Sequence, residues 1–269
     1  MKLRILCDNN TYIDQYYLGE PAFSCYIEEG DARILLDVGY SDVYLRNAEK
    51  MGVDLRALTH VVLSHGHNDH TGGLTPFIER KIAPSAKIIA HPDCFVGKYY
   101  EGEYIGAPYD VEQMLYLADC QLTKEPVQLT ERLWYLGEIP RVLPFEPRTV
   151  IGQRERMGQW EEDDLLDDTA LAYRSDEGLF IITGCAHSGI CNIIEQAKAV
   201  CGDERVIGVL GGFHLFEDDD RAAATAAYFA RHKIPDLYPC HCVSLKVKHR
   251  FMQSLNIHEV GVGMALEVS

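Results

Sequence analysis

The sequence predicts a single α/β domain folded as a four-layered sandwich, and three observations support this class. The chain has 269 residues, of which 47% are apolar and 25% charged, as in an ordinary soluble globular protein. Its first half reads as short β-rich segments separated by tight turns. Its second half alternates strands with amphipathic helices. Because each strand-rich half carries its own helices, we expect one sandwich over residues 1–269 rather than two separate domains.

The first half opens with a predicted strand over residues 1–8, followed by a hairpin that joins 22–28 to 33–38. Residues 58–64 and 87–91 read as buried strands, and 75–81 leave room for a short helix. Between about 95 and 165 the periodicity loosens, and we expect a surface lid or insert there, because loops of this length in compact domains are usually functional or mobile. The acidic residues at 161–164 and 167–168 are expected to be solvated.

The second half continues with regular elements in sequence. Residues 170–173 and 179–183 form a predicted hairpin. A helix follows, because apolar residues from 190 to 201 keep helical spacing between Ser188 and Gly202. Residues 206–210 read as a strand, 221–232 as an Ala-rich helix and 237–241 as a closing strand.

Charge and cysteine content restrict the partners. The formal net charge of −16 repels phosphate backbones, so we expect no nucleic-acid partner. No polybasic stretch or run of about 18 apolar residues indicates a membrane. Nine scattered cysteines without a signal peptide indicate reduced thiols in a cytoplasmic protein. A small-molecule substrate is therefore expected, and a homo-oligomer stays open.

The chemistry concentrates in residues 64–74. His65, His67, Asp69 and His70 fall within six residues at the end of an apolar strand. Neutral imidazoles and carboxylates are the ligands that hold Zn²⁺, Mn²⁺ or Fe²⁺. On a turn after a strand, His65 and His67 can face one ion while Asp69 and His70 face another. The segment therefore predicts two divalent ions of zinc, manganese or iron, with magnesium also possible.

The His-x-His-x-Asp-His pattern resembles the signature of the metallo-β-lactamase superfamily, and the resemblance covers nearly the whole chain. It implies an αββα sandwich. The segment around Asp37 is similar to the first family motif, whose Asp orients ligands beside the metals instead of binding them. Residues 63–74, 184–190, 211–215 and 239–242 together resemble the dihydropterin–ribofuranosylaminobenzene phosphate synthase-like branch.

The resemblance also implies metal ligands at later strand ends. Cys185 or His187 fills the slot of a later family motif, and His187 is the preferred ligand. His241 resembles the histidine of the last motif, with a buried structural imidazole as the alternative. Asp168 stands where the family often supplies its third-motif ligand, and it is otherwise part of an acidic turn.

Other residues are candidates for catalysis or substrate contact. Asp69 both ligates and hydrogen-bonds the nucleophile in this reading, and His214 contacts substrate or transfers a proton, unless it is structural. Backbone N–H groups at Ser188 and Gly189 begin a helix and suit an anion. Arg141 is a candidate partner for an anionic substrate group. Four tyrosines of the insert either stack on a planar ring such as a pterin or anchor the loop: Tyr99, Tyr100, Tyr104 and Tyr109.

The function expected is hydrolysis of a small anionic substrate by a dinuclear metal enzyme, through metal-bound hydroxide or Lewis acidity. One alternative is a synthase that joins a dihydropterin to a phosphorylated aminobenzene riboside and releases pyrophosphate. Another is a non-catalytic sensor that holds metal and ligand. The oxygen-reducing di-iron class on the same fold is disfavoured, because it typically has Glu in place of His67 and an additional flavodoxin-like domain.

Overall fold

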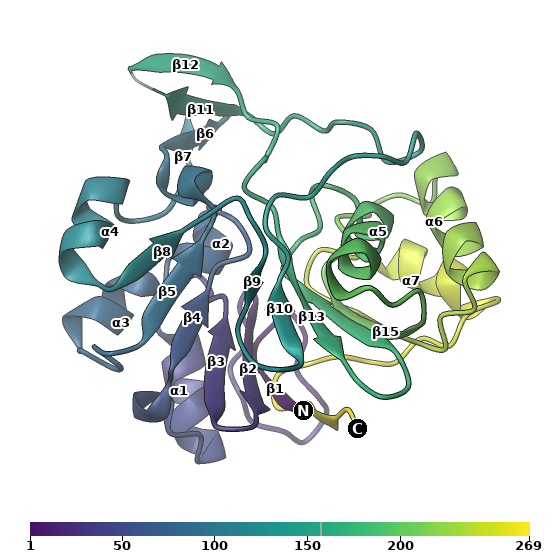
Figure 1. The fold of residues 1–269 in the computed structure, drawn as a ribbon, viewed down its shortest axis with the longest axis horizontal. Helices are drawn as coiled ribbons and strands as arrows, with labels where there is room; N and C mark the ends of the chain where they lie inside the picture. The colour runs from purple at the N-terminus through teal and green to yellow at the C-terminus, as the bar shows by residue number, and fades with distance from the viewer. Residues whose placement is uncertain (157) are drawn as a thin grey trace.

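The computed structural model describes residues 1–156 and 158–269, and its centre consists of two facing sheets (Figure 1). The first sheet has seven strands in the order β17-β1-β2-β3-β4-β5-β8. These strands are β1 (Lys2–Cys7), β2 (Ser24–Glu29), β3 (Ala32–Leu36), β4 (His60–Val62), β5 (Lys87–Ala90), β8 (Cys120–Leu122) and β17 (Ala265–Glu267). Its outer face is covered by α1 (Val43–Met51), α3 (Leu74–Glu79) and α4 (Val111–Leu117). The short helix α2 (Asn68–Thr71) lies between β4 and α3 in the chain.

The second sheet has six strands in the order β16-β15-β14-β13-β10-β9. They are β9 (Val127–Gln128), β10 (Leu133–Tyr135), β13 (Ala170–Arg174), β14 (Leu179–Thr183), β15 (Val206–Gly211) and β16 (Asp236–Pro239). The helices α5 (Ile190–Cys201), α6 (Asp220–Arg231) and α7 (Leu245–Met252) cover its outer face. None of the helices in the described residues is long and apolar enough to cross a bilayer.

Three apolar cores correspond to the three interfaces between four layers. Ile34 and Leu210 belong to the core between the two sheets, where side chains of both inner faces meet. Tyr44 and Leu74 belong to the core under the first helical layer. Phe229, with other α5 and α6 side chains, belongs to the core under the second. The predicted αββα sandwich is therefore confirmed.

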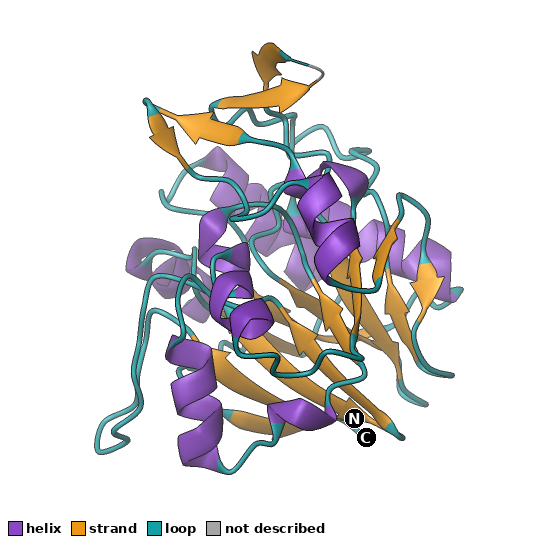
Figure 2. Cartoon of the chain, turned by 90° about the vertical axis from the view of Figure 1, so that its left-hand side faces the viewer, coloured by secondary structure: helices purple, strands orange, loops and turns teal. Residues whose placement is uncertain are grey.

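The segment expected as a lid or insert divides into two parts in the structure. Strands β8, β9 and β10 complete the two central sheets, because their buried side chains, such as Leu133 and Tyr135, join the core. The remainder forms a four-stranded sheet in the order β12-β11-β6-β7, which projects from the body and which we call the hood (Figure 2). Its strands are β6 (Lys98–Tyr100), β7 (Glu103–Tyr104), β11 (Gln153–Arg156) and β12 (Gln159–Glu162). Met157 of the expected insert lies outside the described residues.

The acidic run was expected to be solvated, and for four of its members this is wrong: Asp163, Asp164, Asp167 and Asp168 are buried. For Asp163, Asp164 and Asp167 the physical reason is the presence of buried cations, whereas Asp168 accepts from the Ser188 N–H at 2.8 Å. The Lys98 ammonium lies 2.7 Å from Asp163 and 3.0 Å from Asp167, and the Arg154 guanidinium lies 3.1 Å from Asp164. Buried carboxylates are tolerated when they are paired in this way.

The strand directions determine where polar side chains collect. Strands β3, β4 and β5 are parallel to one another, as are β14, β15 and β16. Asp37 and His65 follow β3 and β4, while Cys185, His214 and His241 follow β14, β15 and β16. Because parallel strands end at the same edge of a sheet, all five residues reach one end of the sandwich.

Candidate metal centre

The loop from β4 to α2 carries His65, His67 and Asp69. Gly66 is required between the two histidines, because a Cβ there would lie 2.1 Å from the Cys94 carbonyl oxygen. The Gly66 N–H donates to Asp167 Oδ2 at 2.7 Å, and Asp167 is held in turn by Lys98. The buried ion cluster therefore fixes the backbone that presents the histidines.

The imidazole rings of His65, His67 and His187 pack against one another, and we call these three residues the first donor group. By ligand-atom distances, His65 groups with Cys185 and His187, and also with His67 and Asp69. The Nε2 atoms of His65 and His187 lie 3.2 Å apart. The ring centroids of His67 lie 4.7 Å from His65 and 4.9 Å from His187. The residue that completes the group thus comes from the loop after β14, two positions beyond Cys185.

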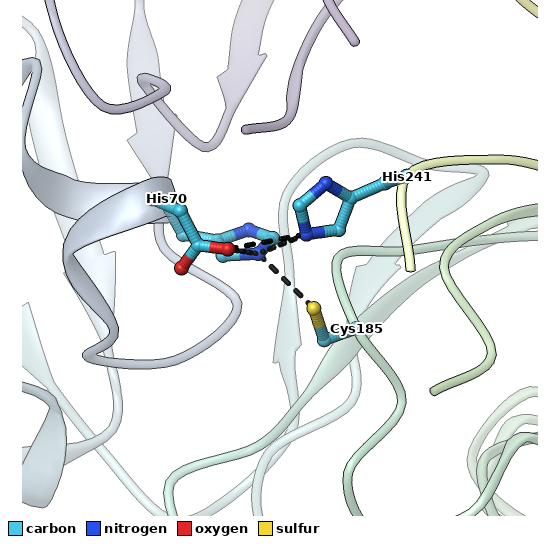
Figure 3. A group of neighbouring side chains, drawn as sticks. His70, Cys185 and His241 are labelled. Carbon is cyan, nitrogen blue, oxygen red and sulfur yellow. Dashed lines mark hydrogen bonds and ion pairs between the residues drawn. The ribbon is translucent and has the colours of Figure 1, made fainter. Parts of the chain in front are cut away.

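The second donor group contains Asp69, His70, Cys185 and His241, whose ligand atoms all lie within 4.8 Å of one another. His70 Nε2 lies 3.2 Å from both Cys185 Sγ and His241 Nε2 (Figure 3). Asp69 Oδ2 lies 3.2 Å from His241 Nε2. Cys185 also groups with His65 and His187, so its thiol lies between the two donor groups.

These donors fit divalent metal ions. Two imidazole nitrogens that share a tetrahedral zinc ion are separated by roughly 3.3 Å, given Zn–N bonds of about 2.0–2.1 Å. The 3.2 Å contacts at His65–His187 and His70–His241 match that value. Nε2 of His67 is buried and has no hydrogen-bond partner in the described residues. Both observations are explained if these nitrogens point at cations.

Burial also keeps the first group in its ligating form. It lowers the pKa of His67 to about 4 and brings the pKa values of His65 and His187 well below the ordinary range. These three imidazoles are therefore neutral at pH 7, as metal binding requires. Burial would lower the pKa of His70 too, but the carboxylates of Asp69 and Asp37 outweigh it and raise the pKa to about 9.

Asp37 fixes the orientation of the donors without belonging to a donor group. Its Oδ2 lies 2.6 Å from His70 Nδ1, and it accepts bonds from the Ser64 N–H and hydroxyl at 2.7 Å each. The Ser64 hydroxyl contacts His65 Nδ1 at 2.9 Å. Asp37 adopts a φ of 58°, and His214 and His241 adopt 47° and 50°. Left-handed non-glycine residues of this kind cluster at functional sites.

Sequence reasoning missed the residues that hold His241. The His241 N–H donates to Asp8 Oδ1 at 2.9 Å, and its Nδ1 contacts Asn9 Oδ1 at 3.0 Å. A usable signal existed, since Asp8 and Asn9 are polar residues directly after the first strand. Cys242, directly after His241, forms a further donor group with Cys185 and His214.

The structure does not place Asp168 in any donor group of the described residues. Its Oδ2 accepts from the Ser188 N–H at 2.8 Å, and burial raises the pKa of its carboxyl to about 7. Asp168 therefore anchors the loop that carries His187.

The expected anion site at the start of α5 is already filled by the protein. Glu146 accepts from the N–H groups of Cys191 and Asn192 at 3.0 and 2.8 Å, and Asp168 takes that of Ser188. A Cβ at Gly189 would lie 2.2 Å from Glu146 Oε2. The prediction of a substrate-binding role for Ser188 and Gly189 is thus not supported by this geometry.

Arg141 is likewise engaged within the protein. Its guanidinium donates to the backbone carbonyls of Asp164 and Leu165 and lies 3.8 Å from the Asp164 carboxylate. These contacts hold the segment before Asp167 and Asp168 in place.

The donor groups form the floor of a cavity of about 520 Å³. His67, Asp69, His214 and His241 line it, and Tyr100 of the hood contributes to its wall. A larger cavity of about 740 Å³ lies along β1, β2 and β17, and its lining contains no histidine or cysteine among the described residues. Of these two cavities, the smaller one is lined by histidine and cysteine side chains of the donor groups.

Comparison with known proteins agrees with the geometry. The sequence profile of the metallo-beta-lactamase superfamily matches residues 18–200. The chain belongs to this superfamily. Most of its members are metal-dependent hydrolases that bind divalent metal ions.

Three similar proteins cover most or all of the chain. An uncharacterized protein of Methanocaldococcus jannaschii is 31% identical over 99% of this chain and 100% of its own length. The 7,8-dihydropterin-6-methyl-4-(beta-D-ribofuranosyl)-aminobenzene-5'-phosphate synthase of the same organism is 30% identical over 82% of this chain and 79% of its own. The crystal structure of Tm1679, described as a metal-dependent hydrolase of the beta-lactamase superfamily, has a TM-score of 0.85 at 29% identity and covers 100% and 99% of the two chains. The resemblance to the synthase branch is thereby confirmed.

Proposed function

We propose that this protein is a dinuclear metal-dependent hydrolase of small molecules. The observation that carries the proposal is the meeting of two donor groups at Cys185 on the floor of one cavity. His65, His67 and His187 would hold one ion, and Asp69, His70 and His241 the other. When bound, divalent ions of zinc, manganese or iron supply Lewis acidity and lower the pKa of water to about 7.

Two residues that line the cavity have the chemistry to move protons. The Asp69 carboxylate faces the cavity, and neighbouring histidines outweigh burial and keep its pKa below the ordinary value. It is therefore an ionised acceptor that orients the attacking water. His214 packs its ring 4.3 Å from that of His187, and its Nδ1 has no hydrogen-bond partner in the described residues. These contacts support His214 as the residue that would protonate the leaving group.

Activity of the reconstituted protein tests this proposal. Protein loaded in turn with zinc, manganese or iron should hydrolyse at least one member of a panel of phosphodiesters, lactones and thioesters. His67→Ala should abolish that activity with unchanged far-ultraviolet circular dichroism. His249→Ala, which alters an exposed histidine of α7, is the matched control and should retain it. Full activity in His67→Ala would contradict the mechanism.

A second candidate function is the synthase reaction, favoured by the 30% identity to the methanogen synthase. Release of pyrophosphate from a dihydropterin donor in the presence of a phosphorylated aminobenzene riboside would support it. If metal-loaded protein releases no pyrophosphate from these substrates, the hydrolase remains as the proposed function.

All nine cysteines are free. We place the protein in the cytoplasm on this basis, because free thiols persist where the redox poise is reducing. Measurement of thiol content after isolation under anaerobic conditions tests this placement.

A further inference from the structure

The charged side chains that line the cavity restrict the substrates that it can bind. Lysine and arginine are absent from its lining in the part of the chain that the structure describes. The two asparagine side chains of the lining each hold a contact within the protein: Asn9 Oδ1 contacts His241, and Asn68 donates to the Tyr104 carbonyl at 3.4 Å. Apart from the metal centre and His214, the cavity therefore offers an anion only neutral partners, such as the hydroxyls of Tyr40 and Tyr100, among the described residues.

The lysines and arginines of the neighbouring segments are not free to bind an anionic substrate group either. The seven lysines and arginines between residues 91 and 160 each lie within 4.0 Å of a carboxylate: Lys98, Lys124, Arg132, Arg141, Arg148, Arg154 and Arg156. The start of α5, the expected phosphate site, is occupied by Glu146 and Asp168. A phosphate far from the reacting atoms would thus lose its hydration without gaining a charged partner.

The mouth of the cavity is instead apolar and aromatic. Tyr40, Tyr100 and Phe216 line it, and each is about half exposed, at 54%, 47% and 50%. Ile105 and Ile151 also line the cavity and belong to segments next to the hood. Exposed aromatic faces beside a reactive centre suit a planar or apolar group, which they hold by stacking and by burial of apolar area.

We infer that the substrate is a molecule with an aromatic or otherwise apolar body whose only charged or strongly polar part is the group that reacts at the metal centre. This inference rests on the proposed function and narrows it. It separates this chain from the phosphorylated substrate named for its methanogen relative. Recognition then depends on Tyr40, Tyr100 and Phe216, and the metal centre supplies the single polar anchor.

Three thiol probes test the inference without requiring turnover, because a thiolate binds zinc directly. The reference probe is 2-mercaptoethanol. In phenylmethanethiol a phenyl ring replaces its hydroxymethyl group, and in 2-mercaptoethyl phosphate its hydroxyl carries a phosphate. Their dissociation constants are measured by calorimetry on zinc-loaded protein. We expect phenylmethanethiol to bind about tenfold or more tighter than the reference, and the phosphate to bring no gain over it.

Variants identify the residues responsible. Tyr100→Ala and Phe216→Ala should each weaken phenylmethanethiol by roughly three- to tenfold, the effect of losing one aromatic contact, and leave 2-mercaptoethanol unchanged. Tyr116→Ala, at a tyrosine of α4 that is 89% exposed and outside the cavity lining, is the control. Tightest binding by the phosphate probe, or no gain from the ring, would overturn this inference alone. Failure of the protein to hold zinc would refute the proposed function itself.

Discussion

Lys98 should be the most important buried charge in this protein. Its side chain and those of Asp163 and Asp167 are fully buried, with separations of 2.7 and 3.0 Å. Lys98→Met removes the cation that the two carboxylates share, so Asp167 loses its lysine partner and Asp163 keeps only the Arg154 guanidinium at 3.7 Å. Removing one partner of a buried ion pair typically destabilises a protein by about 3–5 kcal/mol. We expect a loss of that size at pH 8, and a fall in Tm of roughly 2–4 °C for each kcal/mol.

The dependence of this loss on pH provides a second check. In the variant, burial favours the protonated carboxyls, so the pKa values of Asp163 and Asp167 in the folded state exceed the unfolded value of about 3.9. Stability then falls as pH rises from the unfolded pKa through the folded pKa. The deficit relative to wild type should therefore be smaller at pH 5 than at pH 8.

Urea denaturation of metal-free protein in chelator measures both effects. Lys246→Met is the matched control, because Lys246 pairs with Glu217 at 2.9 Å while both side chains are about two-thirds exposed. Exposed pairs contribute about 0–1 kcal/mol. A triple variant that combines Lys98→Met with Asp163→Asn and Asp167→Asn should recover part of the stability that Lys98→Met loses. A loss below about 1 kcal/mol at pH 8, or a larger deficit at pH 5, would refute the reasoning.

Three further predictions concern the centre. Asp168→Asn should keep the wild-type metal content, because the amide oxygen can still accept from the Ser188 N–H, whereas His187→Ala should lose one metal ion. If elemental analysis shows equal metal loss in both variants, Asp168 is a ligand. Metal affinity should rise with pH up to about 9, because metal binding must displace the proton on His70. Metal titrations that give the same affinity at every pH between 6 and 9 would contradict this. His214→Ala should lower kcat by about 10²–10⁴-fold with unchanged metal content, and an unaltered kcat would exclude proton transfer by His214.

Much of the fold was predictable, because it depends on local patterns. Helix α5 begins and ends where apolar spacing places it, at Ile190 and Cys201, and the strands around His65 and Cys185 follow from short apolar runs. The segment from 95 to 165 was not predictable in the same way. Strands β8 and β9 are only three and two residues long, too short to show a period, and β8 also depends on pairing with β5 of the preceding part of the chain.

The residues of the candidate site also divide into those that local sequence spacing predicts and those that depend on the fold. His65, His67, Asp69 and His70 lie within one loop, so their spacing alone indicates the chemistry. The choice between Asp168, Cys185 and His187 depends on how β13 and β14 bring separate loops together, which spacing does not specify. Glu146 shows the limit most clearly. Its carboxylate reaches the start of α5 from 45 residues away in sequence, so the anion site that the sequence predicted is filled by the protein itself.

The central claim is that two ions bind on the floor of the cavity, and metal stoichiometry tests it most directly. Elemental analysis of protein reconstituted with excess zinc and then desalted should give about two ions per chain for wild type. His241→Ala and His187→Ala should each fall to about one, since each removes a donor from a different group. A wild-type value near zero or one, or two ions retained in both variants, would contradict the account.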